Sequence, residues 1–320
     1  MVLLKIINIH FFFKDMGYGS DLMHIIAIEN FTKDYGNKKG IFDISFHIEK
    51  GEVYGYLGPN GAGKSTTLRH LMGFSKPDCG TLSINDLDCW NDKTIIKKDI
   101  GYLPGEIALP EDMTGIGYLK LIDKLRKTND LSYANELIEY FEIDSSMKIK
   151  KMSKGMKQKI AIIMAFMHDP DILLLDEPTS GLDPLMQEKF IKLINSEKQK
   201  GKTIILSSHI FEEISKLCDR VGIIKKGKLI KEVVMEDLKH SENKTYKIEF
   251  KNENDFTKIK EKYPSAKLKT TEKQVIISIT DNEINDLISD LSSCDIRFLK
   301  EEKHTLEEYF MKFYEDDENV

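Results

Sequence analysis

The sequence predicts an α/β protein with a layered core of parallel strands, followed by a smaller α+β unit. A glycine-rich loop at residues 58–66 stands between a short apolar stretch and a helical one. Strand-like and helix-like stretches then alternate as far as residue 206, which is typical of a parallel sheet covered by helices. From residue 246 the pattern becomes βαββαβ, which predicts a small ferredoxin-like domain.

The first half of the chain contains most of the expected strands. Residues 25–32 and 41–48 alternate as strands do, and a turn rich in Gly, Asn and Lys separates them. Residues 52–57 form a short apolar run directly before the glycine-rich loop, so we expect a buried strand there and a helix that begins near Lys64. Further strands are expected at 81–84 and 99–103.

The middle of the chain adds a helical insertion and two more buried strands. The insertion is expected at about residues 106–168, because its pattern is helical and strongly charged. The individual predictions are helical segments at 115–141, 155–166 and 184–200, and buried strands at 171–175 and 203–206.

The last part of the chain has the pattern of a separate domain. Strands are expected at 246–250, 266–270, 275–279 and 296–299, and helices at 253–262, 284–291 and 306–314. An acidic tail follows. We therefore expect one domain at 23–236 and a C-terminal accessory domain at 244–320. Residues 1–22 are expected to be an extension that is disordered or results from an upstream start codon, since the ordered pattern begins at residue 25.

Composition excludes several classes of protein. The chain has 320 residues, of which 41% are hydrophobic and 31% charged, the balance of a folded globular protein. Its net charge of −6 gives no broad basic footprint, so nucleic acid is not an expected partner. No run reaches 18 apolar residues, so we expect no span of its own across a membrane. The four cysteines lack metal-ligand spacing and are expected to be reduced thiols.

The glycine-rich loop matches the pattern G-x-x-x-x-G-K-[ST] that binds nucleotide phosphates through backbone amides. Glycines allow the backbone to approach phosphate, the lysine places a positive charge against the β- and γ-phosphates, and the serine hydroxyl can ligate Mg²⁺. The residues expected to contact the nucleotide here are Gly58, Pro59, Asn60, Gly61, Ala62, Gly63, Lys64, Ser65 and Thr66.

Two carboxylates end the apolar stretch at 172–177. Asp176 can hold the shell of Mg²⁺, with Ser65 as a second ligand, and Glu177 can polarise an attacking water as general base. Two acids at a strand end are equally often a solvated turn. Their occurrence beside a phosphate-binding loop favours the catalytic interpretation.

Residues 24–232 resemble the nucleotide-binding subunit of an ATP-binding-cassette (ABC) transporter. The resemblance implies that ATP and Mg²⁺ bind and that Glu177 is catalytic. The run 178–184 is similar to the family's D-loop, which implies that Asp183 contacts the opposite subunit. His209, at the end of Leu-Ser-Ser-His, would contact the γ-phosphate as a catalytic residue together with Lys64. Tyr35 stands where the family stacks an aromatic ring on adenine, although a turn tyrosine remains the alternative.

Two motifs depart from the family pattern. The signature, usually Leu-Ser-Gly-Gly-Gln, is Met-Ser-Lys-Gly-Met at 152–156, which keeps Ser153 and Gly155 as expected ligands of ATP held by the other subunit. Gly105 stands where the family has a glutamine, and Glu106 is a candidate to replace that side chain. The stretch Leu-Pro-Gly-Glu and the closing residues 305–310 are similar to those of drug- and bacitracin-type exporters.

The resemblance implies an ATP-hydrolysing subunit that dimerises around two ATP molecules. Its partners would be a second copy, or a paired cassette, and a separate permease with transmembrane helices that performs export. It would act as a peripheral protein on the cytoplasmic face of the cell membrane. A soluble ABC ATPase acting on ribosomes or another cytosolic partner is the alternative, and a nucleotide-gated module with little hydrolysis is a third.

Overall fold

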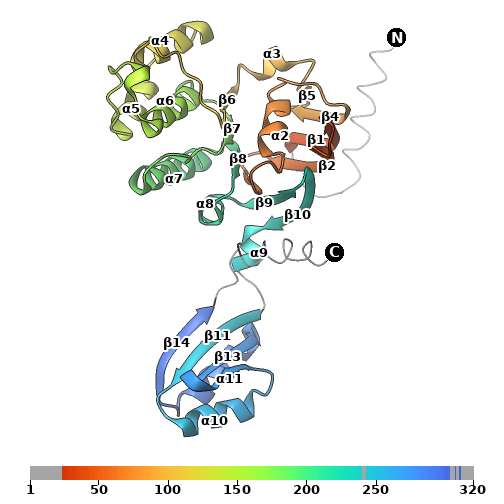
Figure 1. Ribbon diagram of the computed structural model, residues 1–320, viewed down its shortest axis with the longest axis vertical. Helices are drawn as coiled ribbons and strands as arrows, with labels where there is room; N and C mark the ends of the chain where they lie inside the picture. The colour runs from red at the N-terminus through yellow and green to blue at the C-terminus, as the bar shows by residue number, and fades with distance from the viewer. Residues whose placement is uncertain (1–23, 240–242, 303–306, 308–309, 311–320) are drawn as a thin grey trace, which may run out of the picture. The chain divides into compact units, whose positions relative to one another are not determined.

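The computed structural model describes residues 24–239, 243–302, 307 and 310, which form two compact units (Figure 1). One unit comprises the described residues up to His209 together with Ile224–Leu229, and the other comprises Ile210–Ile223 and the described residues from Ile230 onward. The expected extension at 1–22, most of the helix at 306–314 and the acidic tail lie outside the described residues. The domain boundaries 23–236 and 244–320 therefore stay a prediction.

Four parallel strands form the centre of the first unit, as the alternating pattern predicts. In sheet order these are β3 (Val53–Leu57), β8 (Thr203–Ser208), β7 (Ile172–Asp176) and β6 (Ile100–Leu103). Every residue of β3, β7 and β8 is buried. Burial on both faces explains why these strands are continuous apolar runs in the sequence.

The register of this sheet brings three functional segments to one edge. Leu57 pairs with Ser208, Asp176 with Ser207, and Leu103 with Leu175. The carboxyl ends of the strands are therefore aligned. The phosphate loop follows the end of β3, the second acid follows β7, and His209 follows β8. Ligands of parallel α/β sheets bind at such an edge.

A separate antiparallel sheet packs nearby in the same unit, which the sequence did not predict. The strand order in this sheet is β2 (Gly40–Glu49), β1 (His24–Asp34), β4 (Cys79–Ile84) and β5 (Leu87–Asp88). The short helix α3 (Lys93–Ile96) follows β5 in the chain. Phe46 of β2 stacks on Tyr54 of β3 with ring centroids 5.0 Å apart. The first strands of the chain thus serve as a second layer of the core.

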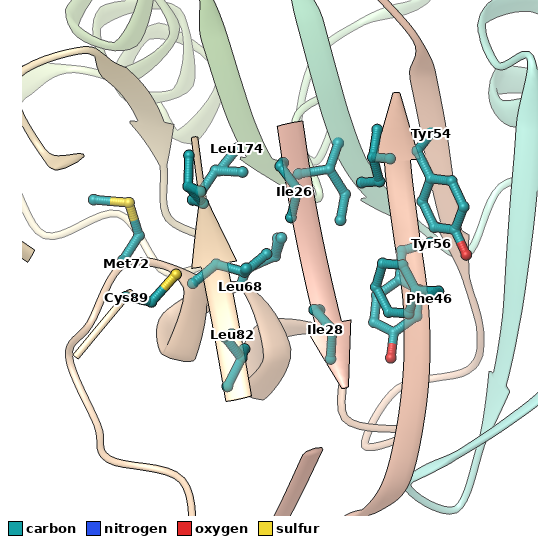
Figure 2. Packing of buried hydrophobic residues seen from close by; sticks show 14 of the residues in the cluster. Ile26, Ile28, Phe46, Tyr54, Tyr56, Leu68, Met72, Leu82, Cys89 and Leu174 are labelled. Carbon is teal, nitrogen blue, oxygen red and sulfur yellow. The ribbon is translucent and has the colours of Figure 1, made fainter. Parts of the chain in front are cut away.

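Helix α2 (Lys64–Leu71) lies within the main hydrophobic cluster (Figure 2). Leu68 and the following Met72 are buried among side chains of β1 and β4, including Ile26 and Leu82. Burial of each such side chain contributes about 1.5–3 kcal/mol. This packing fixes the first turn of α2, where the phosphate loop ends.

The helical insertion contains α4 (Gly115–Arg126), α5 (Ser132–Tyr140), the 3-10 helix η1 (Ile149–Lys151) and α6 (Lys154–Phe166), and its three α-helices lie together beyond β6 in Figure 1. The single helical stretch predicted at 115–141 is divided in two. Lys127 adopts a left-handed conformation with φ of 62°, which ends α4. Helix α7 (Pro184–Gln199) matches its prediction closely.

Several elements follow β8 that the sequence analysis did not predict. These are α8 (Phe211–Leu217), β9 (Arg220–Lys225), β10 (Lys228–Val234) and α9 (Met235–Lys239). The ring of Phe211, at the start of α8, contacts the buried ring of Phe310 with centroids 4.8 Å apart. The end of the described chain therefore packs on α8.

The second unit contains a four-stranded antiparallel sheet with the predicted βαββαβ order of elements. In chain order they are β11 (Asn243–Phe250), α10 (Glu253–Lys262), β12 (Lys267–Lys269), β13 (Gln274–Thr280), α11 (Ile284–Leu291) and β14 (Ile296–Glu302), with 3-10 turns η2 (Thr270–Glu272) and η3 (Asp281–Glu283). The sheet order is β12-β13-β11-β14. Phe256 and Leu287 of the two helices share one core with Ile248 and Val275 of the sheet. The ferredoxin-like assignment stays a prediction.

Candidate functional site

A cavity of about 540 Å³ opens over the phosphate loop at the carboxyl edge of the parallel sheet. It brings together segments that are far apart in sequence: the turn after β1, the loop before α2, and the end of β7. Its lining residues are Tyr35, Lys38, Lys39, Gly40, Pro59, Asn60, Gly61, Gly63, Lys64, Ser65, Thr66, Glu177 and Lys226.

Glycines shape the loop for an anion. Gly61 and Gly63 have φ of 79° and 114°, in the region that favours glycine. Gly58 is required for space, because a Cβ there would lie 2.4 Å from the carbonyl oxygen of Ile224. Within the loop, Ala62 is buried and donates its N–H to the carbonyl oxygen of Pro59. The resulting cradle ends at the N-terminus of α2, which favours phosphate.

Lys64 is buried and its ammonium group is held at the cavity. Its Nζ donates hydrogen bonds to the carbonyl oxygens of Gly58 at 2.6 Å and Pro59 at 3.3 Å. It also lies 3.0 Å from Oε1 of Glu177. An ammonium group in this position can exchange that carboxylate for the phosphates of a nucleotide.

The Glu177 carboxylate contacts both Lys64 and His209, the residue that follows β8. Its Oε2 lies 2.6 Å from Nδ1 of the half-exposed His209. Its backbone has φ of 48°, a left-handed conformation that is rare outside glycine and that clusters at functional sites. The N–H of Glu177 is held by the carbonyl and hydroxyl oxygens of Ser207, each at 3.2 Å.

Asp176, the last residue of β7, directly precedes Glu177 and is almost completely buried. The hydroxyl of Ser207 donates a 2.5 Å hydrogen bond to its Oδ1. Burial raises the pKa of the neighbouring Tyr102 to about 12, and the charge of Asp176 adds to this increase. Ser207 thus positions both acids, a role that the sequence analysis missed because serine at a strand end has no distinctive pattern.

The donors present fit a magnesium ion better than a transition metal. Ser65 offers a hydroxyl at the cavity, and Asp176, which is buried and does not line the cavity, offers a carboxylate at the end of β7. Mg²⁺ prefers oxygen ligands completed by phosphates and water. Among the described residues there is no group of three or more His, Cys, Asp and Glu side chains that could hold a metal by itself.

The cavity is more basic than the sequence analysis predicted. Lys38, Lys39 and Lys226 line it in addition to Lys64, so its charge complements a triphosphate. Lys38 and Lys39 belong to the turn that contains Tyr35, so their closeness to Tyr35 in the sequence could have indicated that they lie at the same site. Lys226 comes from the β9–β10 hairpin, and nothing in the local sequence relates it to the loop. Tyr35 itself is 58% exposed at the cavity wall.

The other predicted nucleotide contacts lie outside this cavity. Ser153 caps α6, where its hydroxyl accepts from the N–H of Met156, and Asp183 caps α7 in the same way through Met186. A Cβ on Gly155 would lie 2.8 Å from the carbonyl oxygen of Gly181. The signature segment therefore packs directly against the 178–183 loop.

A second cavity of about 870 Å³ lies between the helical insertion and the core of the first unit. Phe74 and Leu125 are exposed there, at 54% and 70%. The lining residues are Met72, Phe74, Thr94, Lys97, Lys98, Tyr102, Ile122, Leu125, Arg126, Lys127, Thr128, Met164 and His168. In the part of the chain that is described, no helix has the length and apolar character needed to span a bilayer.

Comparisons with known proteins agree with this geometry. Residues 41–180 match the family described as ABC transporter. The bacitracin transport ATP-binding protein BcrA of Bacillus licheniformis is 31% identical over 296 residues, which cover 90% of this chain and 96% of the relative. The linearmycin resistance ATP-binding protein LnrL of Bacillus subtilis (strain 168) is 37% identical over 64% of this chain and 68% of the relative.

Solved structures have the same fold over the cassette. An ATP-binding subunit of an ABC transporter has 29% identity and a TM-score of 0.61, covering 67% of this chain and 92% of the other. The dimeric cassette MJ0796 in a post-hydrolysis state with ADP and Pi has 25% identity and a TM-score of 0.60, covering 66% and 98%. From the phosphate loop, the acids at the end of β7 and a relative matched over nearly its full length, it follows that the chain is an ATPase that belongs to the ATP-binding subunits of ABC transporters.

Proposed function

We propose that the 540 Å³ cavity binds ATP and that Glu177 activates the water that attacks its γ-phosphate. The observation that carries this proposal is the position of the Glu177 carboxylate, between Lys64 and His209 at the cavity. Lys64 would bind the β- and γ-phosphates after releasing Glu177. His209 would then orient the γ-phosphate and the water, and Tyr35 would stack on adenine.

The metal is assigned to Ser65 and Asp176, because Ser65 supplies a hydroxyl at the cavity and Asp176 supplies a carboxylate at the end of β7. Bound Mg²⁺ would neutralise phosphate charge and fix the geometry of the triphosphate. The hydrogen bond from Ser207 holds the Asp176 carboxylate in one orientation for this purpose.

Two copies are proposed to complete the site. Ser153, Gly155 and Asp183 do not line the cavity over their own phosphate loop, and they lie at or near helix N-termini, which favour anions. In a dimer, Ser153 and Gly155 of one copy would bind the γ-phosphate held by the other. Buried contacts link this surface to the catalytic segment, since Gln158 of α6 donates a 2.7 Å hydrogen bond to the carbonyl of Pro178.

The permease is proposed to dock in the 870 Å³ groove. The groove combines exposed apolar side chains, such as Phe74 and Leu125, with the basic residues Lys97, Lys98 and Lys127. A short amphipathic segment with acidic residues on one side would complement both features. The protein would then lie at the cytoplasmic face of the membrane. The names of BcrA and LnrL favour export of an antibiotic-like compound.

Co-purification from the native host tests this function. The tagged chain would be isolated from gently solubilised membranes and its partners identified by mass spectrometry. We expect a stoichiometric protein with several transmembrane helices, and we expect it to be lost when Phe74 and Leu125 are replaced by Asp. Recovery only with ribosomes or other cytosolic partners would instead support the alternative of a soluble ABC ATPase.

A further inference from the structure

Gly105 lies directly against the carboxylate of Asp176. The parallel register pairs Leu103 of β6 with Leu175 of β7, so the chain beyond β6 runs beside the end of β7. A Cβ placed on Gly105 would lie 2.8 Å from Oδ2 and 3.0 Å from Cγ of Asp176. Contacts this short force one of the two groups to move.

The glycine is needed for space and not for its conformation. Unlike Gly61 and Gly63 of the phosphate loop, Gly105 does not have a left-handed φ. Any residue could adopt its backbone conformation. A larger residue at this position would therefore have too little space beside Asp176.

Asp176 has little freedom to yield to a larger neighbour. It is 2% exposed, and its Oδ1 is engaged by the Ser207 hydroxyl at 2.5 Å. A side chain at position 105 would meet Oδ2, the other oxygen. Rotation of the carboxylate away from that side chain would weaken a buried hydrogen bond, which is unfavourable because a buried polar group would lose its partner.

We propose that Gly105 is a positioning residue that sets the orientation of the Asp176 carboxylate toward the metal. This inference rests on the metal site proposed above. It also means that the glutamine expected from the family pattern does not fit here, because its Cβ would occupy the space that Asp176 needs. In this chain the main chain after β6 contacts the metal ligand, and no side chain extends from that position.

The same strand reaches the groove proposed for the permease. Tyr102 of β6 lines that groove, and its ring contacts Phe74 edge-on with centroids 5.6 Å apart. Three residues later the chain meets Asp176. A displacement of β6 by a docked partner would therefore change the metal ligand through backbone contact alone.

The test measures metal affinity without turnover. Mn²⁺ serves as the probe for the Mg²⁺ site, and electron paramagnetic resonance measures its binding in the presence of a non-hydrolysable ATP analogue. We expect Gly105→Ala to weaken Mn²⁺ by about 10–100-fold, the usual effect of disturbing a residue that orients a metal ligand. Gly105→Gln should bind Mn²⁺ at least as weakly as Gly105→Ala does. Affinity for the analogue in EDTA should stay within about twofold of wild type.

Two variants in the same loop separate the alternatives. Ala108→Gln adds the same side chain at an exposed position and should leave Mn²⁺ affinity unchanged. Unchanged affinity in Gly105→Ala, or tighter binding in Gly105→Gln, overturns the inference. Loss of Mn²⁺ binding in Glu106→Ala but not in Gly105→Ala also overturns the inference, and it assigns the effect on the metal site to Glu106. Failure of the wild-type protein to bind the analogue at all would refute the proposed function instead.

Discussion

Replacement of Glu177 by Gln separates the chemical step from nucleotide binding. The amide keeps the size of the side chain but cannot accept a proton from water. General bases contribute about 10²–10⁴-fold to rate, so kcat should fall by that factor, or about 2.7–5.4 kcal/mol in activation free energy.

The ion pair with Lys64 predicts a second, opposite effect on binding. At the observed 3.0 Å and an effective dielectric constant of about 20, its gross Coulomb energy is about 5.5 kcal/mol. Desolvation offsets most of this, and a net value of about 1 kcal/mol is reasonable for such a pair. Because Glu177 competes with phosphate for Lys64, its neutralisation should tighten ATP binding about fivefold.

Phosphate release and fluorescent-nucleotide titration measure the two quantities. Glu139→Gln, at an exposed position of α5, is the matched control and should change neither. A Glu177→Gln turnover within tenfold of wild type would refute the role of Glu177 as general base. An unchanged or weaker affinity for ATP would refute the competition for Lys64.

Three further perturbations address the loop, the insertion and the C-terminal unit. Lys64→Ala should weaken ATP at least about tenfold in the same titration, because a charged hydrogen-bond donor is lost, while the circular dichroism spectrum stays unchanged; normal binding would contradict the phosphate-loop assignment. Burial lowers the pKa of His168 to about 4, so the unfolded chain takes up a proton between pH 6.5 and 4 that the native state does not. The contribution of His168 to folding stability should therefore be lost as the pH falls through that window, by at most about 1.4 kcal/mol per pH unit. This part of the pH dependence should be absent in His168→Gln when unfolding is followed in urea. Phe256→Ala removes a buried ring from the C-terminal core and should cost about 3–5 kcal/mol there, detected by limited proteolysis; loss of ATP binding in this variant would show that the two units are not independent.

The elements nearest the phosphate loop could be predicted from sequence because local and global signals agree there. The apolar run before the loop, the glycines and the first residue of α2 all lie where the pattern places them. The strand that ends in Asp176 is likewise a continuous apolar run, because both faces of the parallel sheet are covered.

Other features depend on contacts that no local pattern encodes. The antiparallel sheet packs on β3 through the stacked rings of Phe46 and Tyr54, a contact that alternation along each strand does not specify. Lys127 ends α4 in a left-handed conformation without a glycine, so the helical pattern appeared unbroken. The contributions of Ser207 and Lys226 depend on the order of strands and the β9–β10 hairpin.

The contact between Phe211 and Phe310 affects how a shortened form of the protein should be designed. A truncation after Glu302 keeps β14 but removes the ring that covers the start of α8, two residues beyond His209. A change in ATPase activity after such a truncation would combine loss of that cover with loss of the other residues that follow Glu302. Replacement of Phe310 alone, in the otherwise full-length chain, isolates the first effect, and a purification tag is better placed at the other end.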